Sequence, residues 1–173
     1  MDRWLSIAAA VGAICAVAIS LYQAALAREQ QRASAWPYVA QSNGFMPGTP
    51  YVRRVENEGV GPARVRSYQV LVDGRAVPTW GAAMRALTDT IDASAVFSSI
   101  GRGSVLPPGA TLTVLQIPPG AEAVAFWRAA QTRLETVVCY CSIYDECWIS
   151  DTRTDEPAPV RACPDYGDAA FRN

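Results

Sequence analysis

The segment that best indicates the fold of this chain lies within residues 134–148 and reads Cys139-Tyr140-Cys141-Ser142-Ile143-Tyr144-Asp145-Glu146-Cys147-Trp148. Apolar residues continue through this segment at the spacing of a β-strand, where alternate side chains share one face. A further cysteine, Cys163, follows in a polar tail that contains proline. We therefore expect a long strand here, tied by disulfide bonds to the end of the chain.

The spacing of the four cysteines restricts how they can pair. On an extended strand, Cys139 and Cys141 point to the same face with Cα atoms about 6.5–7 Å apart, too far for an easy mutual bond. Two pairings remain: Cys139–Cys163 with Cys141–Cys147, and Cys139–Cys147 with Cys141–Cys163. Residues 145–146 are Asp-Glu, which suit a two-residue hairpin poorly because such turns need positive φ. A wider loop would place Cys141 opposite Cys147, so we favour the first pairing.

The same four cysteines allow two other interpretations, a zinc site and a redox-active thiol pair. Structural zinc sites usually contain C-x₂₋₄-C pairs, whereas this chain has C-x-C followed by longer intervals. A redox pair usually has C-x-x-C spacing and basic neighbours, whereas the neighbours here are Asp145 and Glu146. We therefore expect structural disulfides, with no metal and no cofactor.

Two missing residue types exclude many activities. The chain has no histidine, and all 15 of its basic residues are arginine. Without histidine there is no Ser-His-Asp or Cys-His catalytic group and no imidazole ligand for a metal. Without lysine there is no Schiff base, Ser-Lys pair or P-loop lysine. The net charge of −1 gives no general attraction for nucleic acid. We expect a protein that is not an enzyme and binds no nucleic acid.

An uncharged apolar stretch at residues 5–27 predicts a membrane anchor within residues 1–32. As a helix it would extend roughly 34 Å, enough to cross a hydrocarbon core of about 30 Å. A cleaved signal peptide is the alternative, because Ala-Leu-Ala at residues 25–27 fits the cleavage pattern. The weak positive charge before the stretch and its length favour the anchor, which would contact membrane lipid.

Small residues recur along one face of this expected helix, at Ala8, Gly12, Ala16 and Ser20. Such ridges allow membrane helices to approach closely, although alanine-rich helices also produce them by chance. The ridge makes another membrane or envelope protein, or a second copy of the chain, a candidate partner.

The orientation of the anchor is contested by two patterns. Arginines near its ends weakly place the C-terminal part in the cytoplasm. Four cysteines beyond the anchor instead favour an oxidising compartment. We give the cysteines more weight and expect a single-pass protein of the bacterial inner membrane with its C-terminal domain in the periplasm.

The remaining chain alternates short strands with turn residues. We expect a linker leading into the first strand at residues 33–50, a β-sandwich domain at residues 51–150 and a disulfide-tethered tail at residues 151–173. Strands are predicted at residues 51–57, 63–72, 104–106, 111–117 and 134–144, with an exposed loop at residues 88–104. Residues 79–87 and 122–132 have helical spacing and predict one or two short helices.

At residues 55–63, Val-Glu-Asn-Glu-Gly-Val-Gly-Pro-Ala, the chain resembles immunoglobulin-like domains of bacterial cell-envelope proteins. There N-x-G-x-G-P-A connects the first two strands, and Leu-Pro-Pro-Gly at residues 106–109 resembles a later turn. With the anchor, the whole resembles uncharacterised single-pass envelope proteins. The resemblance implies an immunoglobulin-like β-sandwich outside the cytoplasm, and it implies no activity.

From these observations we expect a non-enzymatic, membrane-anchored interaction module or accessory subunit of a membrane complex. Its partner surface would be the aromatic rim formed by Tyr140, Tyr144 and Trp148. The alternative is a redox or metal-binding protein that acts through the four cysteines. A third hypothesis is a small anionic ligand bound on a sheet face that carries Arg53, Arg64 and Arg66.

Overall fold

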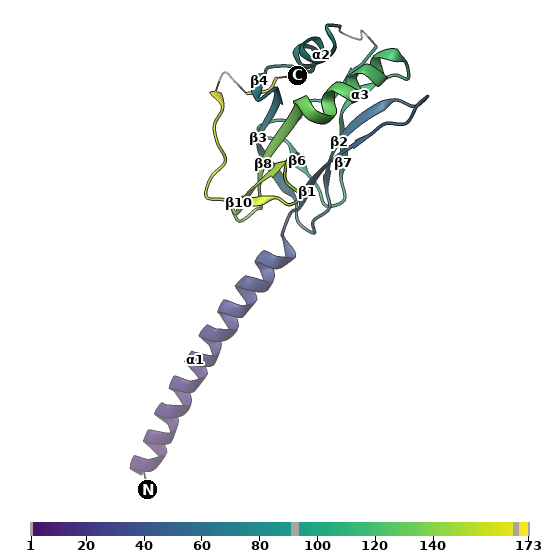
Figure 1. Ribbon diagram of the computed structural model, residues 1–173. Coiled ribbons are helices and arrows are strands. Elements are labelled where there is room, and N and C mark those ends of the chain that lie inside the picture. Colours follow the sequence, from purple (N-terminus) through teal and green to yellow (C-terminus); the bar gives the residue numbers. More distant parts are fainter. Residues whose placement is uncertain (1, 91–93, 168–169, 173) are drawn as a thin grey trace. The chain divides into compact units, whose positions relative to one another are not determined.

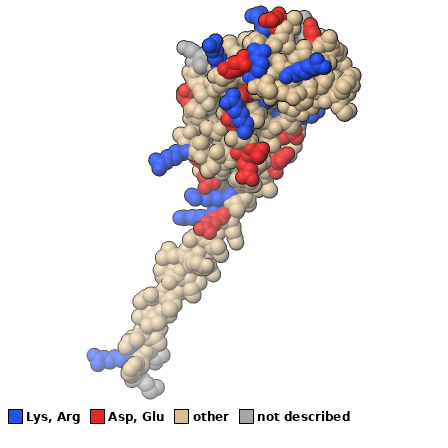
Figure 2. Space-filling view, in the orientation of Figure 1, with Lys and Arg blue, Asp and Glu red and all other residues tan. Residues whose placement is uncertain are grey.

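The computed structural model describes residues 2–90, 94–167 and 170–172. The chain divides into two compact units, Met1–Ser34 and Ala35–Asn173. The first is one α-helix, α1 (Asp2–Ser34), of 33 residues. Its segment Ser6–Ser34 is long and apolar enough to cross a membrane, a test that a signal sequence near the N-terminus would also pass. In Figure 2, the charged atoms on α1 lie toward its two ends, and its middle carries none.

The second unit contains two antiparallel sheets and two helices (Figure 1). One sheet has the strand order β1 (Val39–Gly44), β2 (Tyr51–Asn57), β7 (Thr111–Ile117) and β5 (Val96–Phe97). The other has the order β10 (Ala158–Val160), β9 (Cys147–Asp151), β8 (Leu134–Cys141), β3 (Ala63–Val72) and β4 (Arg75–Val77), and β6 (Val105–Leu106) also pairs with β3. The prediction of a β-rich unit with short helices is therefore confirmed. Because the helices accompany two antiparallel sheets, the fold class of the chain is mixed α and β.

The sheets share one apolar core because inward side chains alternate along their strands. In β2, Tyr51 and Val55 are buried, and in β3 Val65, Tyr68 and Val70 are buried. Side chains from both sheets belong to the same cluster. In β3, a β-bulge between Val65 and Ser67 shifts the alternation, so that Val65 and Tyr68 both face the core.

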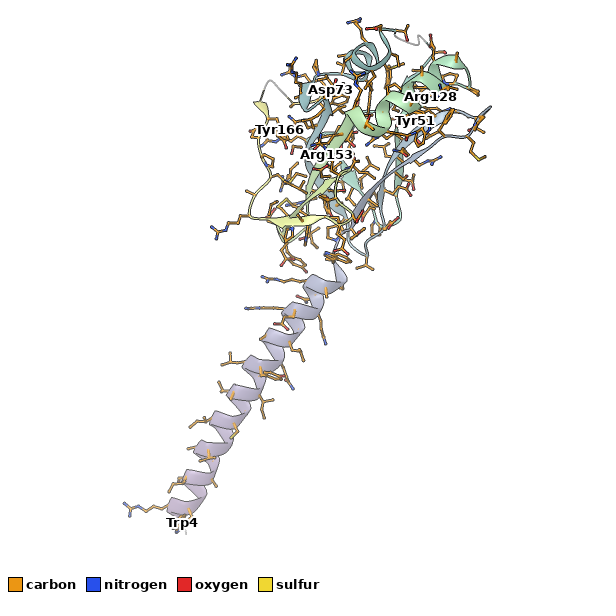
Figure 3. All side chains as sticks on the ribbon, in the orientation of Figure 1. Trp4, Tyr51, Asp73, Arg128, Arg153 and Tyr166 are labelled. Atoms are coloured by element: carbon orange, nitrogen blue, oxygen red, sulfur yellow. A yellow bond between two sulfur atoms is a disulfide. The ribbon has the colours of Figure 1, made fainter. Side chains whose placement is uncertain are left out.

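Two helices close one end of this core. Helix α2 (Trp80–Thr88) begins at Thr79, whose side chain accepts a hydrogen bond from the Ala82 amide, and its buried residues are Trp80, Ala83, Met84 and Leu87. These four residues stand at i, i+3, i+4 and i+7, the spacing that predicts a helix within residues 79–87. Helix α3 (Ala121–Arg133) places Phe126 against Tyr51, with ring centroids 5.0 Å apart. Figure 3 shows the labelled Tyr51 beside α3.

The connection between β2 and β3 passes from one sheet to the other and is organised by a buried asparagine. The Asn57 carboxamide oxygen accepts hydrogen bonds from the amides of Tyr38 (3.2 Å) and Gly59 (3.1 Å). Its nitrogen donates to the carbonyls of Gly61 and Leu106, each at 2.9 Å. A side chain at position 61 would overlap the backbone of the preceding segment, so glycine is required there.

Three predicted segments differ from the observed structure. The linker at residues 33–50 contains β1, which pairs with β2 along its whole length. The tail at residues 151–173 contains β10 and contributes Phe171 to the core, where its ring contacts Tyr68 and Trp80 at 5.4 Å. The expected exposed loop at residues 88–104 contains β5 and the buried Ile100. Phe171 was missed because it packs against Tyr68 and Trp80, which lie far away in the chain. β1 and β5 have too few buried apolar residues to give a period-two pattern.

We predict that Asn57→Ala lowers the free energy of unfolding by about 2–4 kcal/mol, since four backbone groups lose their partner in a buried place. Chemical denaturation of the full chain in detergent would measure this. Glu58→Ala, at the exposed neighbouring position, is the control and should change stability little. Equal stability of the Asn57→Ala variant and the parent would contradict the prediction.

Candidate functional site

The four cysteines beyond α1 form two disulfide bonds. Cys139 of β8 is bonded to Cys163 in the C-terminal segment, with Cα atoms 5.6 Å apart. Cys141 is bonded to Cys147, and these residues face each other in the β8–β9 ladder. Residues 142–146 form the wider loop expected from the sequence, and Asp145 adopts positive φ. The pairs are those that the strand geometry favours.

The two disulfides lie against each other and form a sulfur cluster. The Sγ atoms of Cys141 and Cys163 are 3.9 Å apart, although they belong to different bonds. The Sγ atoms of Cys141, Cys147 and Cys163 all lie within 4.8 Å of one another. Such a group could hold a metal only after reduction, because bonded sulfurs are not thiolate ligands. Oxidised, the cluster links β8, β9 and the C-terminal segment.

A groove of about 330 Å³ borders the sulfur cluster, and charged residues line it. Its charged residues are Arg66, Arg102, Asp145, Arg161 and Asp165. Asp145 is paired with Arg64 and also with Arg66, the latter at 3.1 Å. Because these groups are largely exposed and partly paired, the groove has no strong net attraction for an anion.

The predicted basic face of Arg53, Arg64 and Arg66 does not exist. Arg64 and Arg66 belong to β3 and pair with Asp145. Arg53 belongs to β2 in the other sheet, and its side chain is buried between the sheets with 3% exposure. The hypothesis failed because sequence adjacency of basic residues does not reveal that two strands belong to different sheets.

The predicted aromatic rim is only partly exposed. Tyr140 is buried and stacks on Trp148, with ring centroids 5.9 Å apart. Burial raises the pKa of Tyr140 to about 12, although a backbone hydrogen bond from Val39 opposes this. Tyr144 is 43% exposed and lies beside Ile143, which is 48% exposed. Tyr140 faces the core because it alternates with the cysteines, so the exposed surface is reduced to Ile143 and Tyr144, with Trp148 half-buried.

A second site, of which only Arg53 stood out in the sequence, lies where β1 faces β9. Arg53 Nη2 donates to Thr136 Oγ1 at 2.6 Å, and Thr136 Oγ1 donates to Gln41 Oε1 at 2.6 Å. Gln41 Nε2 donates to the carbonyls of Thr136 (3.1 Å) and Ser150 (2.9 Å). Burial raises the pKa of the neighbouring Tyr68 well above its usual range, and the charge of Arg53 opposes that shift. We call Gln41, Arg53, Thr136 and Ser150 the inter-sheet polar network.

A sequence signal for this network was present at one position. Arg53 stands between Tyr51 and Val55 at an inward position of a strand that otherwise alternates correctly. A charged residue at such a position is rare unless it has a partner. Gln41, Thr136 and Ser150 gave no signal, because polar residues at these positions are equally common on exposed faces.

Along α1, the small residues Ala8, Gly12, Ala16 and Ser20 are all exposed. The Ser20 hydroxyl donates to the Ala16 carbonyl at 2.8 Å, so it is satisfied within the helix. Cys15, the remaining cysteine, is free and also lies on this helix. The ridge is therefore an exposed stripe along α1.

Comparisons of the chain with protein-family models, with curated proteins and with solved structures gave no match.

We predict that the two disulfides contribute unequally to stability. Replacing Cys139 and Cys163 by serine should lower the free energy of unfolding by about 3–4 kcal/mol, because this bond closes the longer loop. Replacing Cys141 and Cys147 by serine should lower it by about 2–3 kcal/mol. Chemical denaturation without reductant would measure both. Cys15→Ser is the matched control and should leave stability unchanged; a larger loss for the shorter loop would argue against this account.

We predict that Glu135→Gln stabilises the protein at neutral pH. Burial, then the charge of Asp151, raises the pKa of Glu135, although Arg153 contacts it at 2.5 Å. A folded-state pKa above the unfolded value means that the folded protein binds this proton more tightly, so ionised Glu135 opposes folding. The gain should shrink as the pH falls through the raised pKa, measured by denaturation over a pH series. Glu58→Gln, at an exposed position, should show no such gain, and a less stable Glu135→Gln variant at pH 7 would refute the prediction.

Proposed function

We propose that this is a non-enzymatic, membrane-anchored envelope protein whose Ala35–Asn173 unit is an interaction module or an accessory subunit of a membrane complex. The observation that carries the proposal is α1, whose uncharged apolar stretch is long enough to cross a membrane. A surface helix of a water-soluble protein would have a polar face, and residues 5–27 have no charge on any side. An anchored domain without histidine or lysine suits binding better than catalysis.

We place this unit in the periplasm, with the anchor in the bacterial inner membrane. The support is the pair of disulfide bonds, one of which fixes the C-terminal segment to β8. Disulfides persist in the periplasm and are rare in the cytosol, where thiols are kept reduced. Both bonds involve β8, so the fold would lose two cross-links in a reducing compartment.

We also propose that the two sheets form an immunoglobulin-like sandwich. Supporting this are the shared core and the β2–β3 connection, in which Asn57 and Gly61 occupy the positions of the N-x-G-x-G-P-A motif. The same connection brings the chain from one sheet to the other, as in a sandwich.

The partner would be another membrane or envelope protein, or a second copy of this chain. Two surfaces support this: the small-residue ridge of α1 and the exposed pair Ile143 and Tyr144. Without a polar face, membrane helices associate mainly by close packing of such ridges.

The partner proposal predicts that a complex survives gentle detergent extraction of the full chain. Gly12→Leu with Ala16→Leu should abolish the complex, because larger side chains separate the helix backbones. Ala10→Leu with Ala18→Leu, on the other side of the helix, is the matched control and should preserve it. Cross-linking followed by size analysis measures the complex formed by each variant. If the full chain is a monomer with no co-purifying partner, the proposal is wrong.

A second candidate function, a redox or metal-binding role of the sulfur cluster, rests on the 3.9 Å approach of two disulfides. A thiolate released at one bond would lie beside the other, which is the geometry that thiol–disulfide exchange requires. Thiol counting by mass spectrometry on protein taken from its own compartment separates the two functions. We expect Cys139, Cys141, Cys147 and Cys163 to be fully bonded; four free thiols or bound zinc would support the second candidate instead.

A further inference from the structure

A cavity of about 330 Å³ opens at the edge of the two sheets, where β1 faces β9. Arg53 and Gln41 line it from one sheet, Ser150 lines it from the other, and Thr152 lines it from the turn after β9. Its rim is the turn between β9 and β10, with the exposed residues Asp155 and Glu156. The size lies at the lower end of the range typical of small-molecule sites.

Arg53 is the unusual feature of this cavity. It is 3% exposed, and none of the ion pairs found among the described residues involves it. Its Nε is buried without a hydrogen-bond partner, and its charge lies close enough to the Tyr68 hydroxyl to oppose the rise in the pKa of that group. An arginine stays charged at physiological pH, and a buried charge without a counter-charge is strongly unfavourable. The site therefore has one positive charge that an oxyanion would compensate.

The inter-sheet polar network holds this guanidinium in a fixed place. Thr136, itself fully buried, accepts from Arg53 and donates to Gln41, which bridges to Ser150 on β9. Three strands thus fix the donor before any ligand arrives. Preorganised donors bind planar oxyanions such as carboxylates well, because little side-chain freedom is lost on binding.

The rim of the cavity has the opposite charge. Asp155 and Glu156 are exposed and adjacent. The side chain of Asp151, by contrast, accepts a hydrogen bond from the Arg153 amide at 2.9 Å, and its negative charge raises the pKa of Glu135. A simple anion would be attracted by Arg53 and repelled by the rim. A molecule with a carboxylate at one end and an ammonium at the other could place the carboxylate at Arg53 and the ammonium at the rim.

We propose that this cavity binds a small zwitterion of the free amino-acid class, with its carboxylate on Arg53 and its ammonium toward Asp155 and Glu156. All residues that line the cavity belong to the Ala35–Asn173 unit, and none of them is a cysteine of the sulfur cluster. The proposal therefore stands whether or not the chain functions as an anchored subunit.

Calorimetric titration of the full chain in detergent tests this, with glycine, L-serine, L-glutamine and L-glutamate as probes. At least one probe should bind saturably, and its methyl ester and its N-acetyl derivative should each bind at least tenfold more weakly. Arg53→Gln should weaken binding of the amino acid at least tenfold. Arg64→Gln, which removes a positive charge outside the cavity, is the matched control and should leave the affinity unchanged.

Replacing Asp155 by Asn together with Glu156 by Gln tests the ammonium end at an exposed turn where folding is not at risk. This variant should bind the amino acid more weakly than the parent does, and its affinity for the N-acetyl derivative should be unchanged. No saturable binding of any probe up to roughly 10 mM, or equal affinity for acid and methyl ester, would overturn the proposal. Equal affinity for the N-acetyl derivative would also overturn it, because the rim would then have no role. The derivative comparison uses the unmodified protein, so it decides the question even if Arg53→Gln fails to fold.

Discussion

The structure of the Ala35–Asn173 unit depends on the pairing of β8 with β3 on one side and β9 on the other. This central strand is buried on both faces, since all but one of its residues, Val137, are buried. One face carries Thr136, Val138 and Tyr140 into the core between the sheets. The other carries Cys139 and Cys141 to their disulfides. Because successive side chains of a strand alternate, a single register fixes both the core and the cross-links.

That register also explains the two features that we consider for function. The cysteines meet their partners because Cys141 faces Cys147 across the ladder and Cys163 lies over Cys139. Thr136, two residues before Val138 on the inner face, reaches Arg53 of the opposite sheet. A shift of β8 by one residue would exchange the faces, placing cysteines in the core and Thr136 outside it. The sulfur cluster and the cavity are thus two consequences of one strand pairing.

A buried arginine rarely improves stability, since desolvation of the charge outweighs most compensating contacts. Natural domains keep such groups mainly where they have a task. The inter-sheet polar network joins Arg53 to the uncharged Thr136 hydroxyl and leaves Nε without a partner, so the network positions the charge more than it neutralises it. This is why we assign ligand binding to the cavity and only a structural role to the paired, exposed Arg64 and Arg66.

Local patterns in the sequence determined much of the architecture: the apolar helix, strands β2, β3 and β7, the Thr79-capped α2 and the wide loop between β8 and β9. These depend on periodicity, capping and turn chemistry, which act between near neighbours. Only the tertiary structure decided which strands share a sheet, and hence that Arg53 is separated from Arg64, that Tyr140 is buried and that Gln41 meets Thr136. These contacts join residues far apart in the chain, and the free energy that selects them comes from burial in one shared core, which no single stretch of sequence contains.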